Sequence, residues 1–329
     1  MRAVVIDGPG ALRVGEVPDP VPGAGEVVIR TLSAAICNAT DVHIWEGRLG
    51  EDLRPAFPHV LGHERSGVVV AVGPGVEGIA VGDRVACWAK MDGAFAEYDV
   101  LRPNDYPMVV LGEGVSDDAG ALLEFVGATL RCLHAARLRP GERVLVLGQG
   151  VQGLVLAQEA KLLGAGLVAG VDLVPFRLER ARALGCDVVY DLTGKSAAEA
   201  ATELREVAGG EFDLVIDAAG KGRWDGGNSV NLGLELLRWG GRYVVYGLPT
   251  EDVEVNARLI GVKGITFKGI DTPPHEVGRL LSLGARWVAE GRLDLESLVT
   301  HRVPLDRVEE GLVLCRDRPH EVLKVMVDF

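Results

Sequence analysis

Two short segments near the amino terminus, AAICNATDVHIWEG and PHVLGHERSG, contain side chains that can bind a metal ion or carry a proton. They bring together a thiol, a hydroxyl, two imidazoles and two carboxylates: Cys37, Thr40, Asp41, His43, His63 and Glu64. Thiolate, imidazole and carboxylate are good ligands for Zn²⁺, and three protein ligands leave an open position for a substrate. A plainer interpretation stays open from the residue types alone, because a lone buried cysteine commonly packs as a small hydrophobe.

A glycine-rich motif marks a second kind of site. Gly148, Gly150 and Gly153 form G-x-G-x-x-G between the apolar run VLVLG and a helical pattern, and Asp172 follows 19 residues beyond Gly153. Such glycines allow a tight turn, a close approach of a pyrophosphate and close helix packing. A carboxylate at the end of the next strand accepts hydrogen bonds from a ribose and repels a 2′-phosphate. The motif predicts NAD rather than NADP, although the glycines could also serve turn geometry alone.

Three residues near these motifs have two interpretations each. Arg177 either covers the adenosine or the pyrophosphate, or is a solvated charge on a helix. Trp45 and Trp88 flank the candidate metal segments and either line a substrate pocket or belong to the core.

The pattern of elements predicts two kinds of domain. Residues 1 to about 115 hold short β-branched runs separated by Gly, Pro and Asp turns, which is typical of an antiparallel, barrel-like domain. The segment from Ser116 to about 138 is predicted to be a helix, with Ser116 as its cap. After it, strands and helices alternate, which predicts a parallel doubly wound sheet. The tail from about Ile270 shows two amphipathic helices and a last strand, VLKVMVDF, that could return to the first domain.

Composition restricts the possible partners and the compartment. The chain has 329 residues, enough for two domains, and a net charge of −13, which argues against nucleic acid or an anionic membrane as a partner. The amino-terminal sequence resembles a first strand, so no export is expected. The five cysteines are widely spaced and form no Cys-x-x-Cys motif, which indicates a reducing, cytoplasmic compartment.

Taken together, these motifs resemble those of the medium-chain dehydrogenase/reductase superfamily. The chain is most similar to its zinc-dependent polyol (sorbitol) and threonine dehydrogenases. The resemblance covers nearly the whole length; besides the segments above it includes GAFAEY at Gly93 to Tyr98 and Leu-Leu-Glu at Leu122 to Glu124. It implies an α/β chain with a GroES-like β-barrel catalytic domain at 1–125, completed by 270–329, and a Rossmann NAD-binding domain at 126–269.

The resemblance also implies roles for individual residues. It implies Cys37, His63 and Glu124 as zinc ligands, with Glu64 either ligating or exchanging with water and substrate; Glu124 could otherwise be a surface charge. At matching positions, the Thr40 hydroxyl is implied to take the alcohol proton and His43 to pass it to solvent. Asp41 is implied to orient the zinc-binding histidine, and Lys324 is implied to be a basic residue that contacts the cofactor pyrophosphate.

Two departures from the family pattern affect these expectations. Two residues, Asn38 and Ala39, separate Cys37 from Thr-Asp where the family usually has one, which could shift Cys37 or Thr40 relative to the metal. The lobe whose four cysteines bind a structural zinc in many members is expected to be absent here, because its region has only Cys87. One zinc per subunit is therefore expected.

The implied activity is hydride transfer between a secondary alcohol or polyol, or its ketone, and NAD. The family also implies a homodimer or homotetramer, formed through the region from Tyr243 to Ile270. One alternative is a zinc-free quinone or enone reductase of the same superfamily that uses NAD(P)H. Another is a catalytically inert NAD-binding protein.

Overall fold

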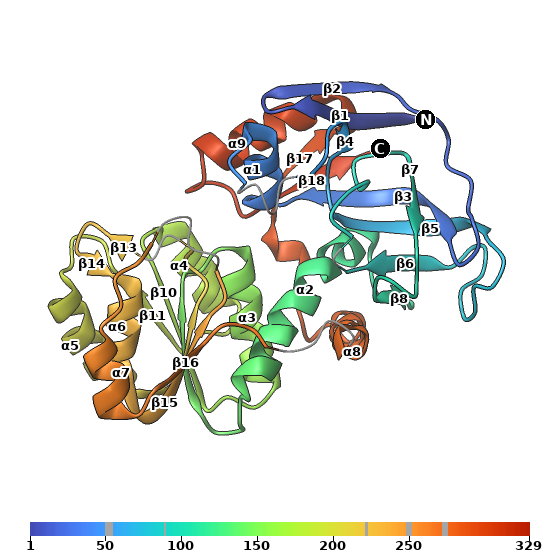
Figure 1. Cartoon of the computed structure of the whole chain (residues 1–329). Coiled ribbons are helices and arrows are strands. Elements are labelled where there is room, and N and C mark those ends of the chain that lie inside the picture. The colour runs from blue at the N-terminus through green and yellow to red at the C-terminus, as the bar shows by residue number, and fades with distance from the viewer. Residues whose placement is uncertain (50–54, 89, 221–222, 248–251, 272–275) are drawn as a thin grey trace. The chain divides into compact units, whose positions relative to one another are not determined.

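The structure is a computed structural model that describes residues 1–49, 55–88, 90–220, 223–247, 252–271 and 276–329. Its chain divides into two compact units (Figure 1). Unit 1 is Met1–Ala128 with His275–Phe329, and unit 2 is Thr129–Pro274.

Unit 1 is built on two mostly antiparallel sheets. The larger has the strand order β17-β18-β3-β5-β6-β8, with β7 also paired to β3, and the smaller has the order β2-β1-β4. The strands are β1 (Arg2–Gly8), β2 (Ala11–Glu16), β3 (Val27–Ile36), β4 (His59–Val60), β5 (Glu64–Val72), β6 (Arg84–Cys87), β7 (Tyr98–Leu101), β8 (Met108–Val110), β17 (Val299–Pro304) and β18 (Lys324–Asp328). β3 is the centre of the larger sheet, because it pairs with β5, β7 and β18.

The helices of unit 1 come from both ends of the chain. They are α1 (Thr40–Glu46), α2 (Asp117–Ala136), which continues into unit 2, α8 (Val277–Ala289) and α9 (Val308–Asp317), with the short η3 (Glu296–Leu298) and η4 (Leu305–Arg307). The Ser116 hydroxyl accepts a hydrogen bond from the Ala119 amide, which confirms the predicted cap of α2. β18 pairs with β3, so the prediction that the last strand returns to the first domain is also confirmed.

Unit 2 is a parallel six-stranded sheet with helices on both faces. Its order is β11-β10-β9-β12-β15-β16, formed by β9 (Arg143–Leu147), β10 (Leu167–Asp172), β11 (Val188–Asp191), β12 (Phe212–Asp217), β15 (Leu237–Val245) and β16 (Thr266–Lys268). α3 (Val151–Leu162) and α4 (Pro175–Ala183) connect the strands on one side, while α5 (Ala197–Ala208), α6 (Ser229–Leu236) and α7 (Ala257–Lys263) lie together on the other (Figure 1). The direction of winding reverses at β9, and ligands of open parallel sheets bind at such a point.

Three elements of unit 2 were not predicted. They are the short hairpin of β13 (Arg223–Trp224) and β14 (Gly227–Asn228), the edge strand β16, and α7, none of whose residues is buried. All three are short or lack a buried face, so the periodicity that reveals an element from sequence is missing.

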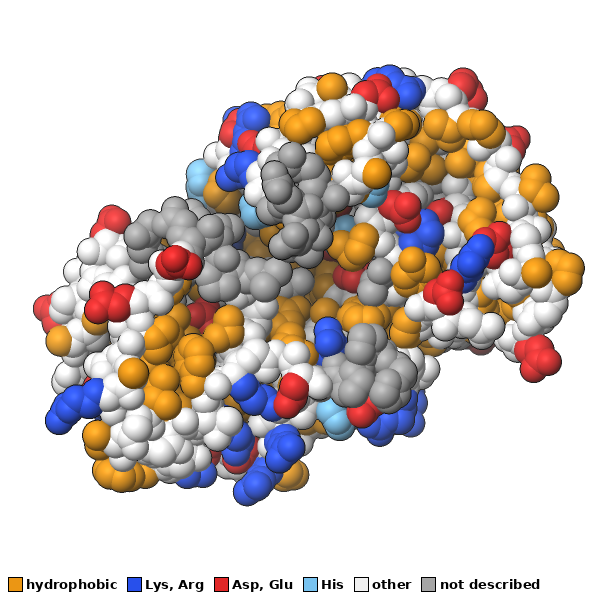
Figure 2. Space-filling model, in the orientation of Figure 1, with side chains coloured by type: hydrophobic (Ala, Val, Ile, Leu, Met, Phe, Trp, Pro, Cys, Tyr) orange, Lys and Arg blue, Asp and Glu red, His pale blue; other side chains and the backbone are white. Residues whose placement is uncertain are grey.

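The described helices include none that is long and apolar enough to cross a membrane. On the face seen in Figure 2, acidic and basic side chains are interspersed, and neither sign forms one continuous area.

Candidate active site

The structure brings three of the predicted metal ligands together in unit 1. Glu64 begins β5 and lies opposite Ala35 of β3, so that Cys37, just beyond the end of β3, comes next to His63 and Glu64. The Cys37 sulfur, a His63 ring nitrogen and a Glu64 carboxylate oxygen all lie within 4.8 Å of one another. His63 and Glu64 are buried, and Cys37 is half-buried. A soft sulfur, an imidazole and a carboxylate at this spacing suit Zn²⁺.

Asp41 connects two of these residues through its two oxygens. Its Oδ1 lies 3.2 Å from His63 Nδ1, and its Oδ2 accepts a hydrogen bond of 2.8 Å from the Cys37 amide. Burial lowers the pKa of His63, but Asp41 and the Cys37 sulfur outweigh that effect and raise this pKa well above its ordinary value. With Nδ1 engaged by Asp41, the Nε2 atom of His63 is the one left for a ligand.

Lys324 is placed in this cluster rather than in the dinucleotide-binding unit. Its ammonium donates to both Glu64 carboxylate oxygens at 2.8 Å and to the Ile36 carbonyl at 3.1 Å, and it lies 5.1 Å from the Phe125 ring centroid. Lys324 is only 3% exposed. Lys324 thus forms an ion pair with a candidate metal ligand, and the pyrophosphate contact implied by the family resemblance stays a prediction.

Glu124 is not part of the close group. It lies on α2 and is 9% exposed, but among the described residues only Cys37, His63 and Glu64 place their ligand atoms within 4.8 Å of one another. Glu64 thus lies in the close group with Cys37 and His63, and the role of Glu124 as a ligand stays a prediction from the family resemblance.

The extra residue after Cys37 is anchored rather than loose. Asn38 donates from Nδ2 to the Leu323 carbonyl at 2.9 Å, and its Oδ1 lies 3.6 Å from the Cys315 sulfur. These bonds attach the turn to the segment before β18 and to α9, and Cys37 lies within reach of His63. Sequence reasoning treated Asn38 only as an anomaly of spacing, although an amide beside a ligand could have suggested this anchor.

The two residues predicted to move protons lie on α1. Thr40 is its first residue and is half-buried, and His43 is one turn further along. Burial, followed by the nearby charge of Arg48, lowers the pKa of His43, so the ring is neutral at neutral pH and able to accept a proton. The tryptophans are largely buried: Trp45 belongs to the hydrophobic core of unit 1, and Trp88 is 8% exposed.

Unit 2 holds the dinucleotide fingerprint at the point where its sheet reverses. Gly148 has φ 88°, and a Cβ there would come within 2.8 Å of the Ala219 backbone. At Gly150, which caps α3, a Cβ would meet nothing within 4 Å, which leaves room for a phosphate. A Cβ at Gly153 would come within 1.9 Å of the Gly148 carbonyl, so only glycine lets α3 pack this closely.

Asp172 lies where the motif predicts it, at the end of β10. One of its oxygens accepts a 2.6 Å hydrogen bond from the Gln149 amide inside the glycine-rich turn. The other oxygen accepts from the Leu173 and Val174 amides. The Arg177 guanidinium lies 3.8 Å from the oxygen that accepts from Gln149. The carboxylate is thus held rigidly beside the turn.

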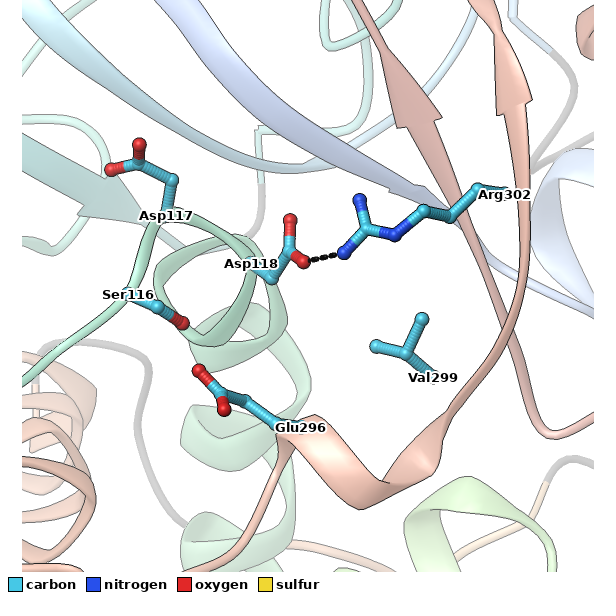
Figure 3. A pocket seen from close by; sticks show the side chains of 6 residues that line it. All are labelled: Ser116, Asp117, Asp118, Glu296, Val299 and Arg302. Atoms are coloured by element: carbon cyan, nitrogen blue, oxygen red, sulfur yellow. Dashed lines mark hydrogen bonds and ion pairs between the residues drawn. The ribbon is translucent and has the colours of Figure 1, made fainter.

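A separate cavity of about 350 Å³ lies at the amino-terminal end of α2 and contains none of the predicted site residues. Its lining consists of Ser116, Asp117, Asp118, Glu296, Val299 and Arg302 (Figure 3). Asp118 is already paired with Arg302, and Asp117 with Arg84 at 2.7 Å, so these charges fix the start of α2.

Comparison with known proteins identifies the family of the chain. The sequence model of the family "alcohol dehydrogenase GroES-like domain" matches residues 23–129. The sequence model of the family "zinc-binding dehydrogenase" matches residues 152–286. The sorbitol dehydrogenase of Ovis aries is 31% identical over 339 residues, which cover 94% of this chain and 91% of that protein. The chain belongs to the zinc-dependent alcohol dehydrogenase family of medium-chain dehydrogenases.

Solved members of this family share the fold over its full length. An alcohol dehydrogenase from Thermus sp. ATN1 superposes with a TM-score of 0.83 at 28% identity, covering 100% of this chain and 99% of that one. Galactitol-1-phosphate dehydrogenase from Escherichia coli gives 0.85 at 25% identity and covers 99% of each chain. The family assignment and the predicted fold, a GroES-like domain with a Rossmann domain, are therefore confirmed.

Proposed function

We propose that this dehydrogenase transfers a hydride between a secondary alcohol or polyol, or its ketone, and NAD at one zinc ion per chain. The observation that carries the proposal is the close group of Cys37, His63 and Glu64, two of whose members are held by Asp41. A thiol, an imidazole and a carboxylate that converge on one point form a ligand set that suits Zn²⁺.

These three residues would hold the zinc, with Glu124 available to complete the set. When bound, Zn²⁺ acts as a Lewis acid that lowers the pKa of a hydroxyl at its open position. Glu64 would then have two cationic neighbours, the metal and Lys324, and both would compensate the charge of its carboxylate.

The protein supplies the path for the alcohol proton. Thr40 starts the helix that follows the Cys37 turn, and its hydroxyl is the group proposed to accept the proton from the substrate. His43, one turn further along the same helix and neutral at neutral pH, would pass the proton to solvent.

Asp172 supports NAD as the cofactor. Its carboxylate is fixed beside the glycine-rich turn, where it would accept hydrogen bonds from the adenosine ribose and repel a 2′-phosphate. Arg177 lies close enough to add a charge near the adenosine. A ratio of kcat/KM values for NAD and NADP above about 10 is the expected result, and a preference for NADP would contradict it.

The relatives support proposals for the substrate type, the oligomeric state and the region of contact between subunits. The sorbitol and galactitol-1-phosphate dehydrogenases named above support a polyol-type substrate. Family membership also supports a homodimer or homotetramer formed through the region from Tyr243 to Ile270. Among the described residues β16 is the outermost strand of its sheet there, and an edge strand can pair with that of a second copy.

Metal analysis combined with a substrate screen tests the proposal. Zinc-replete protein is expected to contain one zinc per chain and to form NADH, followed by absorbance, with at least one secondary alcohol or polyol. Cys37→Ala should lose both zinc and activity, whereas Cys186→Ala, a matched change at a buried cysteine of unit 2, should keep both. Enone reduction without metal would favour a zinc-free reductase, and cofactor binding without turnover would favour an inert protein.

A further inference from the structure

A buried carboxylate ends the strand beside the glycine-rich turn. Asp217 is the last residue of β12, and the parallel pairing places it level with Leu147, the residue before Gly148. Asp217 is 4% exposed, and the proposed chemistry assigns it no task. Because a buried carboxylate is costly unless it is hydrogen-bonded, the groups around it indicate what it holds.

Both oxygens of Asp217 are occupied. Oδ1 accepts a 3.0 Å hydrogen bond from the Ala219 amide, and Oδ2 accepts a 2.7 Å hydrogen bond from the Tyr243 hydroxyl. The Ser229 hydroxyl, at 3.5 Å, adds a weaker contact to Oδ2. Burial raises the pKa of Asp217, and these hydrogen bonds oppose that rise. The short bonds to Ala219 and Tyr243 are therefore the ones that fix the carboxylate.

Tyr243 is a rigid donor. Its side chain is fully buried, and its ring stacks on Phe267 with the centroids 5.0 Å apart. Gly233 of α6 also packs against this ring, because a Cβ there would come within 2.6 Å of a Tyr243 ring atom. The phenol thus has no room to turn away from Asp217.

The backbone that Asp217 holds packs directly on the fingerprint. A Cβ at Gly148 would lie 2.8 Å from the Ala219 Cα atom, and the Ala218 amide donates to the Leu147 carbonyl at 2.8 Å. On the other side, a Cβ at Gly247 would lie 2.8 Å from the Gly220 nitrogen. Segment 218–220 is therefore enclosed between two glycines, one of which belongs to the dinucleotide motif.

We propose that Asp217 and Tyr243 are positioning residues of the dinucleotide site. The pair holds segment 218–220 against the Gly148 turn and thereby sets the affinity of unit 2 for the nicotinamide cofactor. Neither side chain is assigned a contact with the cofactor; both act through the Ala219 backbone. The inference rests on the proposed function, because it takes the fingerprint as the NAD site.

Titration of the zinc-loaded protein with NADH, followed by fluorescence without any alcohol present, tests this role. Asp217→Asn and Tyr243→Phe each remove or weaken one buried hydrogen bond, so we expect the Kd for NADH to rise about tenfold. In turnover, KM for NAD should rise while KM for the alcohol stays unchanged. Tyr243→Phe keeps the volume of the ring, so it serves if Asp217→Asn does not fold.

Tyr190→Phe is the matched control, because Tyr190 also donates to a carboxylate of unit 2, Glu203, at 2.8 Å, and this hydrogen bond does not involve segment 218–220. It should leave the Kd for NADH unchanged. A lower melting temperature with an unchanged Kd in Asp217→Asn and Tyr243→Phe would show a purely structural role and overturn the inference. A wild-type protein that binds no NADH would instead contradict the proposed function itself.

Discussion

At the scale of single residues, the proposed metal site depends on Asp41, a carboxylate outside the group of three candidate ligands. Asp41 is fully buried and holds both the His63 ring and the backbone of Cys37. A ligand that is oriented before the metal arrives loses less entropy when it binds, which is why such outer contacts affect affinity strongly.

Replacing Asp41 by Asn should weaken zinc binding about 10- to 100-fold, because the amide cannot provide the negative charge that stabilises the His63 ring orientation. Competition with a coloured chelator measures this affinity. Asp172→Asn, a change of the same kind in unit 2, should leave zinc affinity unaltered. Equal affinities in wild type and Asp41→Asn would remove Asp41 from the site.

Lys324→Met tests the second buried contact. It leaves the Glu64 carboxylate buried without its ammonium, so the metal-free protein should lose about 3 kcal/mol of unfolding free energy in urea. The loss should be smaller in the zinc-loaded protein, because the metal compensates the same carboxylate. Lys324→Arg keeps the charge and serves as the control. Equal losses with and without zinc would show that Glu64 does not face the metal.

At the scale of elements, α3 carries an acidic residue where the core of unit 2 is apolar. Glu159 is fully buried; its Oε1 accepts from the Thr129 hydroxyl at 2.9 Å, and Oε2 has no hydrogen-bond partner among the described residues. Burial raises the pKa of Glu159 well above 4.5, its ordinary value. The folded protein therefore keeps this proton at pH values where the unfolded chain has released it.

The free energy of unfolding should consequently fall as the pH rises from about 4.5 toward the raised pKa of Glu159, by up to about 1.4 kcal/mol per pH unit. Glu159→Gln imitates the protonated acid, so its advantage in melting temperature over wild type should grow between pH 5 and pH 8. The exposed Glu206→Gln should show no such trend. A constant difference for Glu159→Gln would mean that the carboxyl is ionised in the folded state.

Helices and strands with a strong hydrophobic periodicity could be predicted from the sequence. Contacts between side chains that are far apart in the sequence could not. The strands around Gly148, the long helix α2 and the returning β18 all bury continuous apolar faces, which leave a clear signal. The cluster at Cys37 was expected because its residue types and the family pattern coincide. The Glu64–Lys324 ion pair joins positions 260 residues apart, and a pairing of that kind depends on tertiary packing.

At the scale of the whole molecule, the two functions belong to different parts of the chain. All members of the metal cluster lie in unit 1, and the glycine-rich motif with Asp172 lies in unit 2. Each unit has its own hydrophobic core, so binding of the metal and binding of the cofactor should be separable.

Removing zinc with a chelator should abolish alcohol oxidation but change the Kd for NADH by less than about threefold, since the residues that form the dinucleotide site keep their packing. Fluorescence titration of the metal-free protein provides the measurement, and activity should return when zinc is added back. Loss of NADH binding together with the metal would show that the two sites are not independent.

The coordination of zinc is the most direct test of this account, and X-ray absorption at the zinc edge of the purified protein measures it. The account predicts one sulfur at about 2.3 Å and two or three nitrogen or oxygen atoms at about 2.0 to 2.2 Å, with the sulfur signal lost in Cys37→Ser. A zinc shell without sulfur, or one with several sulfurs, would contradict a site built from Cys37, His63 and Glu64.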